Sequence, residues 1–323
     1  MGQVTILRPG TRTTIQDLGR EGYRSLGVSR GGALDLFGAK VINSLLGNPL
    51  DAAVLEVSIG GLQMRFSDTR TIAWCGGDFP VHLAGEQIPP GRCVLVRQDE
   101  ELTVAPTRHG SRCWLALAGG IDVPQVLGSR STDLRAGFGG WEGRALQPGD
   151  ELSLGRIKPP TEQTLRRADW GAPMPWIQTA SPYPTLRIVP GAEWGCFTKK
   201  TRSEFLAAPF TVTAQADRMG VRLQGVELPR KKKSELISEG VAPGTLQVAH
   251  DGQPILLLGD CQTIGGYPKI AHVITVDLAG AAQLQPNDVV RFQEISALEA
   301  RALYLEREND LQRFRVGLAL RAP

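Results

Sequence analysis

The chain has 323 residues, which is enough for two domains of roughly 150 residues each. Hydrophobic residues make up 41% of it and charged residues 21%, a balance that builds buried cores and excludes a mainly disordered chain. The 36 basic and 33 acidic residues leave a net charge of +3, too little for a protein that binds nucleic acid through charge alone.

Short apolar and β-branched runs, separated by turn residues, follow one another along the chain. Such runs are typical of barrels or sandwiches. The predicted strands are Val4–Leu7, Cys93–Arg97, Cys113–Ala118, Thr185–Val189, Pro254–Leu258 and Val289–Phe292. Two segments predict helices. Leu34–Leu46 has apolar residues at helical spacing before Gly47, and Ser296–Leu311 begins with a candidate N-cap serine.

Three fragments recur in the same order about 140 residues later. The matching pairs are Thr71–Ile88 with Thr211–Leu228, His109–Gly120 with Asp251–Gln262, and Gln147–Leu154 with Gln285–Phe292. The repeat predicts two similar β-domains. We therefore expect a mainly β fold with a first domain over 1–156, which includes a helical addition at 34–46, and a second over 185–323, which ends in a helix. The proline-rich stretch 157–184 is expected to link them.

Cysteine usage and hydropathy predict the compartment. The five cysteines are odd in number and form no CxxC pair, which fits reduced thiols that act as small core residues. They are Cys75, Cys93, Cys113, Cys196 and Cys261. No apolar run is long enough for a membrane helix and the N-terminus shows no signal peptide, so we expect a cytoplasmic protein.

Several catalytic motifs are absent from the sequence. It contains no GxxxxGK[ST], no HExxH and no GxSxG, so we expect no P-loop, no metal site and no serine nucleophile elbow. It also lacks the Met-Lys pair that carries covalent biotin. A nucleotide or biotin would therefore bind non-covalently or on a partner.

Pro9–Asp35 is dense in glycine, arginine and hydroxyl residues. Its glycines allow close backbone approach, while Gln16, Asp17 and Arg20 offer polar groups to an anionic or amide ligand. A structured turn in which Asp17 pairs with Arg20 or Arg24 accounts for the same residues equally well.

In Ser238–Ile270, an apolar strand runs into Asp260 and then a Gly-Gly turn. Polar groups at a strand end are typical of a site held on a rigid scaffold. Asp260 is a candidate general base or ligand anchor, with Thr263 and Tyr267 as binding residues. The alternative is a turn in which Asp260 caps its own backbone. Function is favoured because polar residues lie just upstream, namely Gln247, His250 and Asp251.

Three further segments have more ordinary interpretations. Gly128–Asp150 is favoured as a β-connection with an aromatic anchor over a phosphate-binding loop, because it lacks a well-placed lysine. Asp217–Leu223 contributes either a ligand contact or a buried salt bridge between the barrels. Pro229–Lys233 is expected to be a solvated basic loop.

Longer motifs carry a family resemblance. They are TTIQDLGREGYRSLGVSRGGALD, FGGWEGR, DRMGVRLQG, SEGVAPGTLQV and DGQPILLLGDCQTIGGYPKIAHVI. From Val4 to Ser296 the chain resembles the family called allophanate hydrolase subunit 2 or biotin-dependent carboxyltransferase. The resemblance implies two tandem cyclophilin-like β-barrels. The chain departs mildly from the family pattern at Ala249, where proline is usual, and at Ile264, where a second threonine is frequent.

Within that family the resemblance is to the C subunit of the bacterial ATP-dependent 5-oxoprolinase. It implies a protein that is active only in complex, with the B subunit as direct partner and the A subunit opening the lactam, so that 5-oxoproline becomes glutamate with ATP hydrolysis. ATP would be bound by, or shared with, the partner. Two alternatives are the carboxyltransferase component of a biotin-dependent urea or amide carboxylase, and a non-catalytic antagonist of a kinase inhibitor that is similar to the B subunit.

The same resemblance implies the site residues. The catalytic candidates are Asp260, Asp217, Arg218 and Asp17. The candidates for substrate or nucleotide binding are Gln16, Gly19, Arg20, Asn43, Gln247, Thr263, Gly265, Gly266 and Tyr267. We expect the 16–20 and 260–267 stretches to face one polar crevice formed by the two barrels, which would take a small amide.

Overall fold

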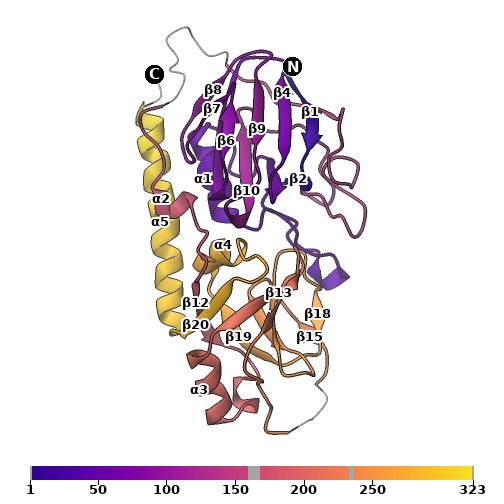
Figure 1. Cartoon of the computed structure of the whole chain (residues 1–323), viewed down its shortest axis with the longest axis vertical. Helices are drawn as coiled ribbons and strands as arrows, with labels where there is room; N and C mark the ends of the chain where they lie inside the picture. Colours follow the sequence, from indigo (N-terminus) through magenta and orange to yellow (C-terminus); the bar gives the residue numbers. More distant parts are fainter. Residues whose placement is uncertain (1, 159–167, 233–235, 322–323) are drawn as a thin grey trace. The chain divides into compact units, whose positions relative to one another are not determined.

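The structure is a computed structural model that describes residues 2–158, 168–232 and 236–321. The chain divides into two compact units (Figure 1). The first contains residues up to Arg20, then Gly31–Ala180 and the chain from Arg313 on, and the second contains Glu21–Arg30 and Ser181–Gln312. The predicted domain boundaries stay a prediction, and residues 159–167 of the predicted linker lie outside the described residues.

The first unit is built from two antiparallel sheets. One has the strand order β11-β1-β4-β9-β6-β7 and the other β2-β3-β10-β5-β8. The strands are β1 (Gln3–Pro9), β2 (Arg12–Gln16), β3 (Val54–Ser58), β4 (Leu62–Phe66), β5 (Arg70–Asp78), β6 (Val81–Leu83), β7 (Glu86–Gln87), β8 (Val94–Val96), β9 (Glu101–Val104), β10 (His109–Leu117) and β11 (Glu151–Ser153).

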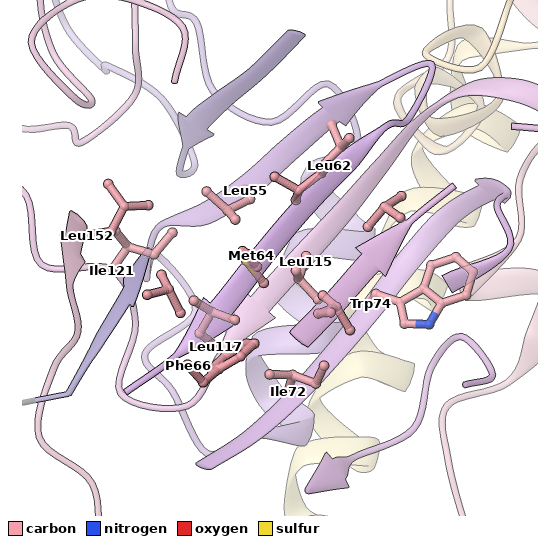
Figure 2. Close-up of a cluster of buried hydrophobic side chains, with 14 of the residues drawn as sticks. Leu55, Leu62, Met64, Phe66, Ile72, Trp74, Leu115, Leu117, Ile121 and Leu152 are labelled. Carbon is pink, nitrogen blue, oxygen red and sulfur yellow. The ribbon is translucent and has the colours of Figure 1, made fainter. Parts of the chain in front are cut away.

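Alternate residues of these strands build one hydrophobic core. Leu62, Met64 and Phe66 of β4 are fully buried, as are Leu115 and Leu117 of β10, and Figure 2 shows these side chains gathered in one cluster. Residues two apart on a strand point to the same face, so each strand contributes every second side chain to the core.

Helix α1 (Leu36–Leu45) confirms the first helical prediction. The Asp35 carboxylate caps it by accepting a hydrogen bond from the Gly38 amide at 2.8 Å. Within the same unit, the short helix α2 (Met174–Ile177) places Trp176 edge-on against Phe37, with ring centroids 5.4 Å apart. The predicted linker therefore contains a helical turn that the prolines did not suggest.

The second unit is a closed barrel with the order β12-β19-β16-β17-β14-β13-β20, beside a separate two-stranded ribbon. The barrel strands are β12 (Thr185–Pro190), β13 (Phe210–Ala216), β14 (Gly220–Gln224), β16 (Thr245–Val248), β17 (Pro254–Leu257), β19 (Lys269–Val273) and β20 (Val289–Glu294). The ribbon strands are β15 (Glu239–Gly240) and β18 (Ile264–Gly265). The prediction of a mainly β chain with few helices and a barrel is confirmed.

Two longer helices lie in the remaining chain. In α5 (Ala297–Arg321), the Ser296 hydroxyl accepts from the Glu299 amide at 3.1 Å, so the predicted N-cap is confirmed, although the helix runs ten residues past Leu311. Helix α3 (Lys199–Ala207) was not predicted, because it buries only two side chains. The short helices are η1 (Arg24–Leu26), η2 (Trp194–Cys196), η3 (Thr275–Asp277) and α4 (Leu278–Ala281). None of the helices in the described ranges has the length and apolarity that a membrane crossing needs.

The repeated fragments lie on strands in both units, but the strands pair differently. β5 pairs with β10, but their counterparts in the repeat, β13 and β17, are not neighbours, because β13 lies between β14 and β20. The sequence similarity therefore does not extend to strand pairing.

All five cysteines are free thiols. Three are buried as predicted, Cys93 is partly buried, and Cys196 is exposed, so the core prediction was wrong for Cys196. Cys196 lies in η2, a surface turn with no buried residue.

Candidate functional site

In the first unit, the Asp17 carboxylate is the centre of a buried hydrogen-bond cluster. Oδ1 accepts from the Gly19 amide at 2.8 Å and from the hydroxyls of Ser129 and Ser131 at 2.6 Å each, and Oδ2 accepts from the Arg130 amide at 2.5 Å. A carboxylate has about four acceptor positions, so the chain itself fills those of Asp17. These bonds join the end of β2 to a loop more than a hundred residues away in sequence.

Arg20 and Gln16 join the same two segments. Arg20 is 1% exposed, donates to the Ser131 carbonyl, and places its guanidinium carbon 4.5 Å from the centre of the Phe138 ring. The Gln16 amide nitrogen donates to the Thr132 carbonyl at 3.2 Å. Gly128–Asp150, the glycine-rich segment that contains Phe138, is therefore a connection with an aromatic anchor, as predicted.

Asn43 is also used inside the chain. It is fully buried in α1, its amide donates to the Ala52 carbonyl at 2.8 Å, and its side-chain oxygen accepts from Asn48 at 3.0 Å. These bonds anchor the end of the helix. The binding role implied for Asn43 by the family resemblance stays a prediction.

In the second unit, Asp260 and Arg218 form a bidentate ion pair, with N–O distances of 2.8 and 2.9 Å. Arg218 is buried and the Asp260 side chain is 16% exposed. The sequence left a ligand contact and a salt bridge between barrels as alternatives, and this salt bridge lies within one barrel. Asp217 is exposed and caps the β13–β14 turn, accepting from the amides of Met219 and Gly220 at 2.7 and 3.1 Å.

A pocket of about 920 Å³ opens in the second unit. It lies against three segments of the second unit: the chain after β14, the β16–β17 turn, and the stretch from β18 to β19. Four predicted binding residues line it, namely Gln247, Gly265, Gly266 and Tyr267. Its lining also includes His250, Asp251, Gln262, Glu227 and Arg230. Asp260 and Thr263 are not among the described residues that line it.

Polar contacts hold one wall of this pocket. The buried Gln247 amide donates to the Tyr267 carbonyl at 3.2 Å and accepts from Gln262 at 3.4 Å. The His250 ring meets the Tyr267 ring edge-on, with centroids 5.1 Å apart. The pocket therefore presents side-chain amides, an imidazole and a phenol, which can donate to and accept from a small polar ligand.

Next to this wall lies a buried lysine that the sequence analysis missed. Lys269 is 7% exposed, and its ammonium lies 2.9 Å from Glu239 and 3.2 Å from Glu193. Burial opposes its charged form, but the hydrogen bonds that the ammonium donates to both carboxylates, together with their negative charges, outweigh burial and raise the pKa of Lys269. The sequence signal that could have identified this lysine is its position at the start of the apolar run KIAHVI.

The predicted site residues therefore fall into groups with separate surroundings. Asp17, Gly19, Arg20 and Gln16 share one cluster in the first unit, and the pocket group lies in the second. The shared crevice stays a prediction. Across the described ranges, no group of three or more His, Cys, Asp or Glu side chains is placed to hold a metal ion.

Comparison with known proteins identifies the family. The model of the carboxyltransferase domain, subdomains A and B, matches residues 26–294. The chain belongs to this carboxyltransferase family. It is 38% identical to the C subunit of Escherichia coli 5-oxoprolinase, with 98% of this chain and 97% of that protein covered. It is 36% identical to the C subunit of Haemophilus influenzae 5-oxoprolinase, with 97% of both covered.

A solved structure of the family shares the fold. The Kluyveromyces lactis urea amidolyase matches 97% of this chain with a TM-score of 0.88 at 27% identity. This chain spans 20% of that much longer protein. The family resemblance is thus confirmed, and so is the mainly β fold, with a closed barrel in the second unit and two sheets in the first.

Proposed function

We propose that this chain is the C subunit of an ATP-dependent 5-oxoprolinase, which acts with the A and B subunits to convert 5-oxoproline into L-glutamate. The observation that carries the proposal is the two-way coverage: the two relatives named as 5-oxoprolinase C subunits match this chain over 97% of their own length. The urea amidolyase contains much more polypeptide, and this chain corresponds to 20% of it.

The second-unit pocket is the proposed substrate site. A lactam has one carbonyl acceptor and one N–H donor, and the side-chain amides of Gln247 and Gln262 offer the complementary groups. Asp260 and Arg218, which the family resemblance marks as catalytic candidates, are not among the described residues that line the pocket. They would act by holding the segment after β17 rather than by touching substrate.

ATP hydrolysis is proposed as a property of the complex, with the nucleotide bound by or shared with the B subunit. A reaction that consumes ATP places the complex, under this proposal, in the cytoplasm. The isolated chain is expected to have no turnover.

The test is reconstitution of the full complex from this chain and the separately purified A and B subunits. Glutamate release from 5-oxoproline, together with phosphate release from ATP, is expected only when all three are present. Equal ATP-dependent turnover by the A and B subunits without this chain would overturn the proposal.

The carboxyltransferase match and the urea amidolyase fold favour a second candidate, a component that carboxylates urea or a related amide. This function requires bicarbonate, ATP, and a biotin carrier together with the biotin carboxylase that loads it. Transfer of labelled bicarbonate carbon to urea, with no glutamate formed from 5-oxoproline, would select it over the first.

A further inference from the structure

The ribbon of β15 and β18 borders the pocket but is not part of the barrel. Its register pairs Glu239 with Gly265 and Gly240 with Ile264, and the Val241 amide donates to the Thr263 carbonyl at 3.0 Å. A two-stranded ribbon is marginally stable by itself. Contacts outside its own backbone must therefore hold it closed.

Lys269 supplies such a contact from the strand that follows the ribbon. The chain runs from β18 through Gly266–Pro268 into Lys269, the first residue of β19. The ammonium then reaches back to Glu239 on the opposite ribbon strand, at 2.9 Å. The ammonium also lies 3.2 Å from Glu193, and the Lys269 amide donates to the same carboxylate at 2.8 Å. We call the contact with Glu239 the ribbon arm and the contact with Glu193 the barrel arm.

The clasped segment is a wall of the pocket. Gly265, Gly266, Tyr267 and Pro268 line it, and a Cβ built on Gly265 would come within 2.7 Å of the Gln247 amide nitrogen. This close approach leaves the wall little freedom while the ribbon stays closed. If the ribbon opened, Gln247 would lose its geometry toward the Tyr267 carbonyl.

We propose that Lys269 is a positioning residue: its ammonium clasps Glu239, closes the β15–β18 ribbon, and so holds the 265–268 wall in the shape that binds substrate. This inference rests on the proposed function only in taking the pocket as the substrate site. A buried ion pair is weak evidence for stability alone, because apolar residues of similar volume often serve as well. Lys269 instead ties two separate segments, at Glu239 and Glu193, to the start of β19, and this gives it a geometric role.

The two arms differ in exposure, and this difference permits a clean experiment. The Glu239 side chain is 61% exposed, whereas that of Glu193 is 14% exposed. Glu239→Ala removes the ribbon arm without burying a lone carboxylate. Glu193→Gln removes the negative charge at the Glu193 contact and leaves the Glu239 contact in place.

The first readout is hydrogen exchange of the full-length chain, which needs no substrate. Glu239→Ala and Lys269→Met are expected to speed exchange of the 236–242 and 262–268 peptides by about tenfold. Barrel peptides around β16 and β17 should exchange at the wild-type rate in Glu239→Ala. Lys269→Arg, which keeps a cation, is expected to restore most of the protection.

The second readout is turnover of the reconstituted complex. Glu239→Ala should raise the KM for 5-oxoproline by about tenfold or more, with kcat changed far less, because a loosened wall weakens binding. Arg187→Met is the matched control, since Arg187 pairs with Asp277 at 2.6 Å within the same unit and does not line the pocket. It should lower Tm and leave KM unchanged.

Unchanged exchange of both ribbon peptides in Glu239→Ala and Lys269→Met would overturn the clasp. Faster exchange with an unchanged KM would overturn the link from the ribbon to substrate binding. If the wild-type complex makes no glutamate, the proposed function fails, and the exchange experiment still decides whether Lys269 holds the ribbon.

Discussion

Asp17 shows how a polar residue in a glycine-rich motif is used by its own chain. Its two oxygens accept hydrogen bonds from two amides and two serine hydroxyls, and the residue is 5% exposed. The same residue type at Asp217 lies exposed on a turn. Removing the charge should therefore cost more stability at Asp17 than at Asp217.

We expect Asp17→Asn to lower the free energy of unfolding by about 3 kcal/mol, because an amide nitrogen would face donors that now meet a carboxylate. Urea denaturation measures this as a lower midpoint at an unchanged slope. The control is Asp217→Asn, which still caps its turn and should change stability by less than about 0.5 kcal/mol. Full stability of Asp17→Asn with loss of activity would instead indicate a ligand contact.

The lowered pKa of His272 predicts a pH dependence of the free energy of unfolding. Burial and then the charge of Lys269 lower the pKa of His272, while Glu193 opposes them. Below about pH 6.5 the unfolded chain therefore binds more protons than the folded one, so this residue's contribution to stability is lost as the pH falls.

His272→Gln should flatten that dependence, because it removes the titration and keeps a polar partner for the Thr245 hydroxyl, now 3.2 Å from the imidazole. Denaturation midpoints between about pH 5 and pH 8 measure the slope. Parallel slopes for the wild type and the variant would contradict the assignment.

At the scale of elements, the Arg218–Asp260 pair joins the β13–β14 turn to the segment after β17. Arg218 also keeps other contacts, but both of its bonds to Asp260 are lost on substitution. Replacing Asp260 therefore carries a cost in stability.

We expect Asp260→Ala to lower the unfolding free energy by about 3 kcal/mol, because it removes the bidentate partner of a buried guanidinium. A double-mutant cycle with Arg218→Met should show strong coupling between the two residues. Additive losses would mean that the pair is not the source of the effect. Lost turnover in a fully stable Asp260→Ala would favour a direct catalytic role.

For the whole molecule, the comparisons and the fold both support membership of the carboxyltransferase family. The family model spans 26–294, which includes most of both units, and the 5-oxoprolinase relatives match almost end to end. In the urea amidolyase, the same fold forms a minor share of a longer chain. We infer that one fold serves both in separate polypeptides and in fused proteins.

The sequence by itself determined six of the strands, the helices α1 and α5, and the family, because alternating apolar residues, caps and turn residues act over short distances. The N-cap residue Ser296 and the run at Cys113–Ala118 are examples. The Asp17 cluster, the Arg218–Asp260 pair and the Lys269 clasp depended on tertiary structure. Each joins residues between 30 and 114 positions apart. Only the folded chain brings such partners within hydrogen-bond distance, since no local pattern encodes which distant donor a carboxylate will meet.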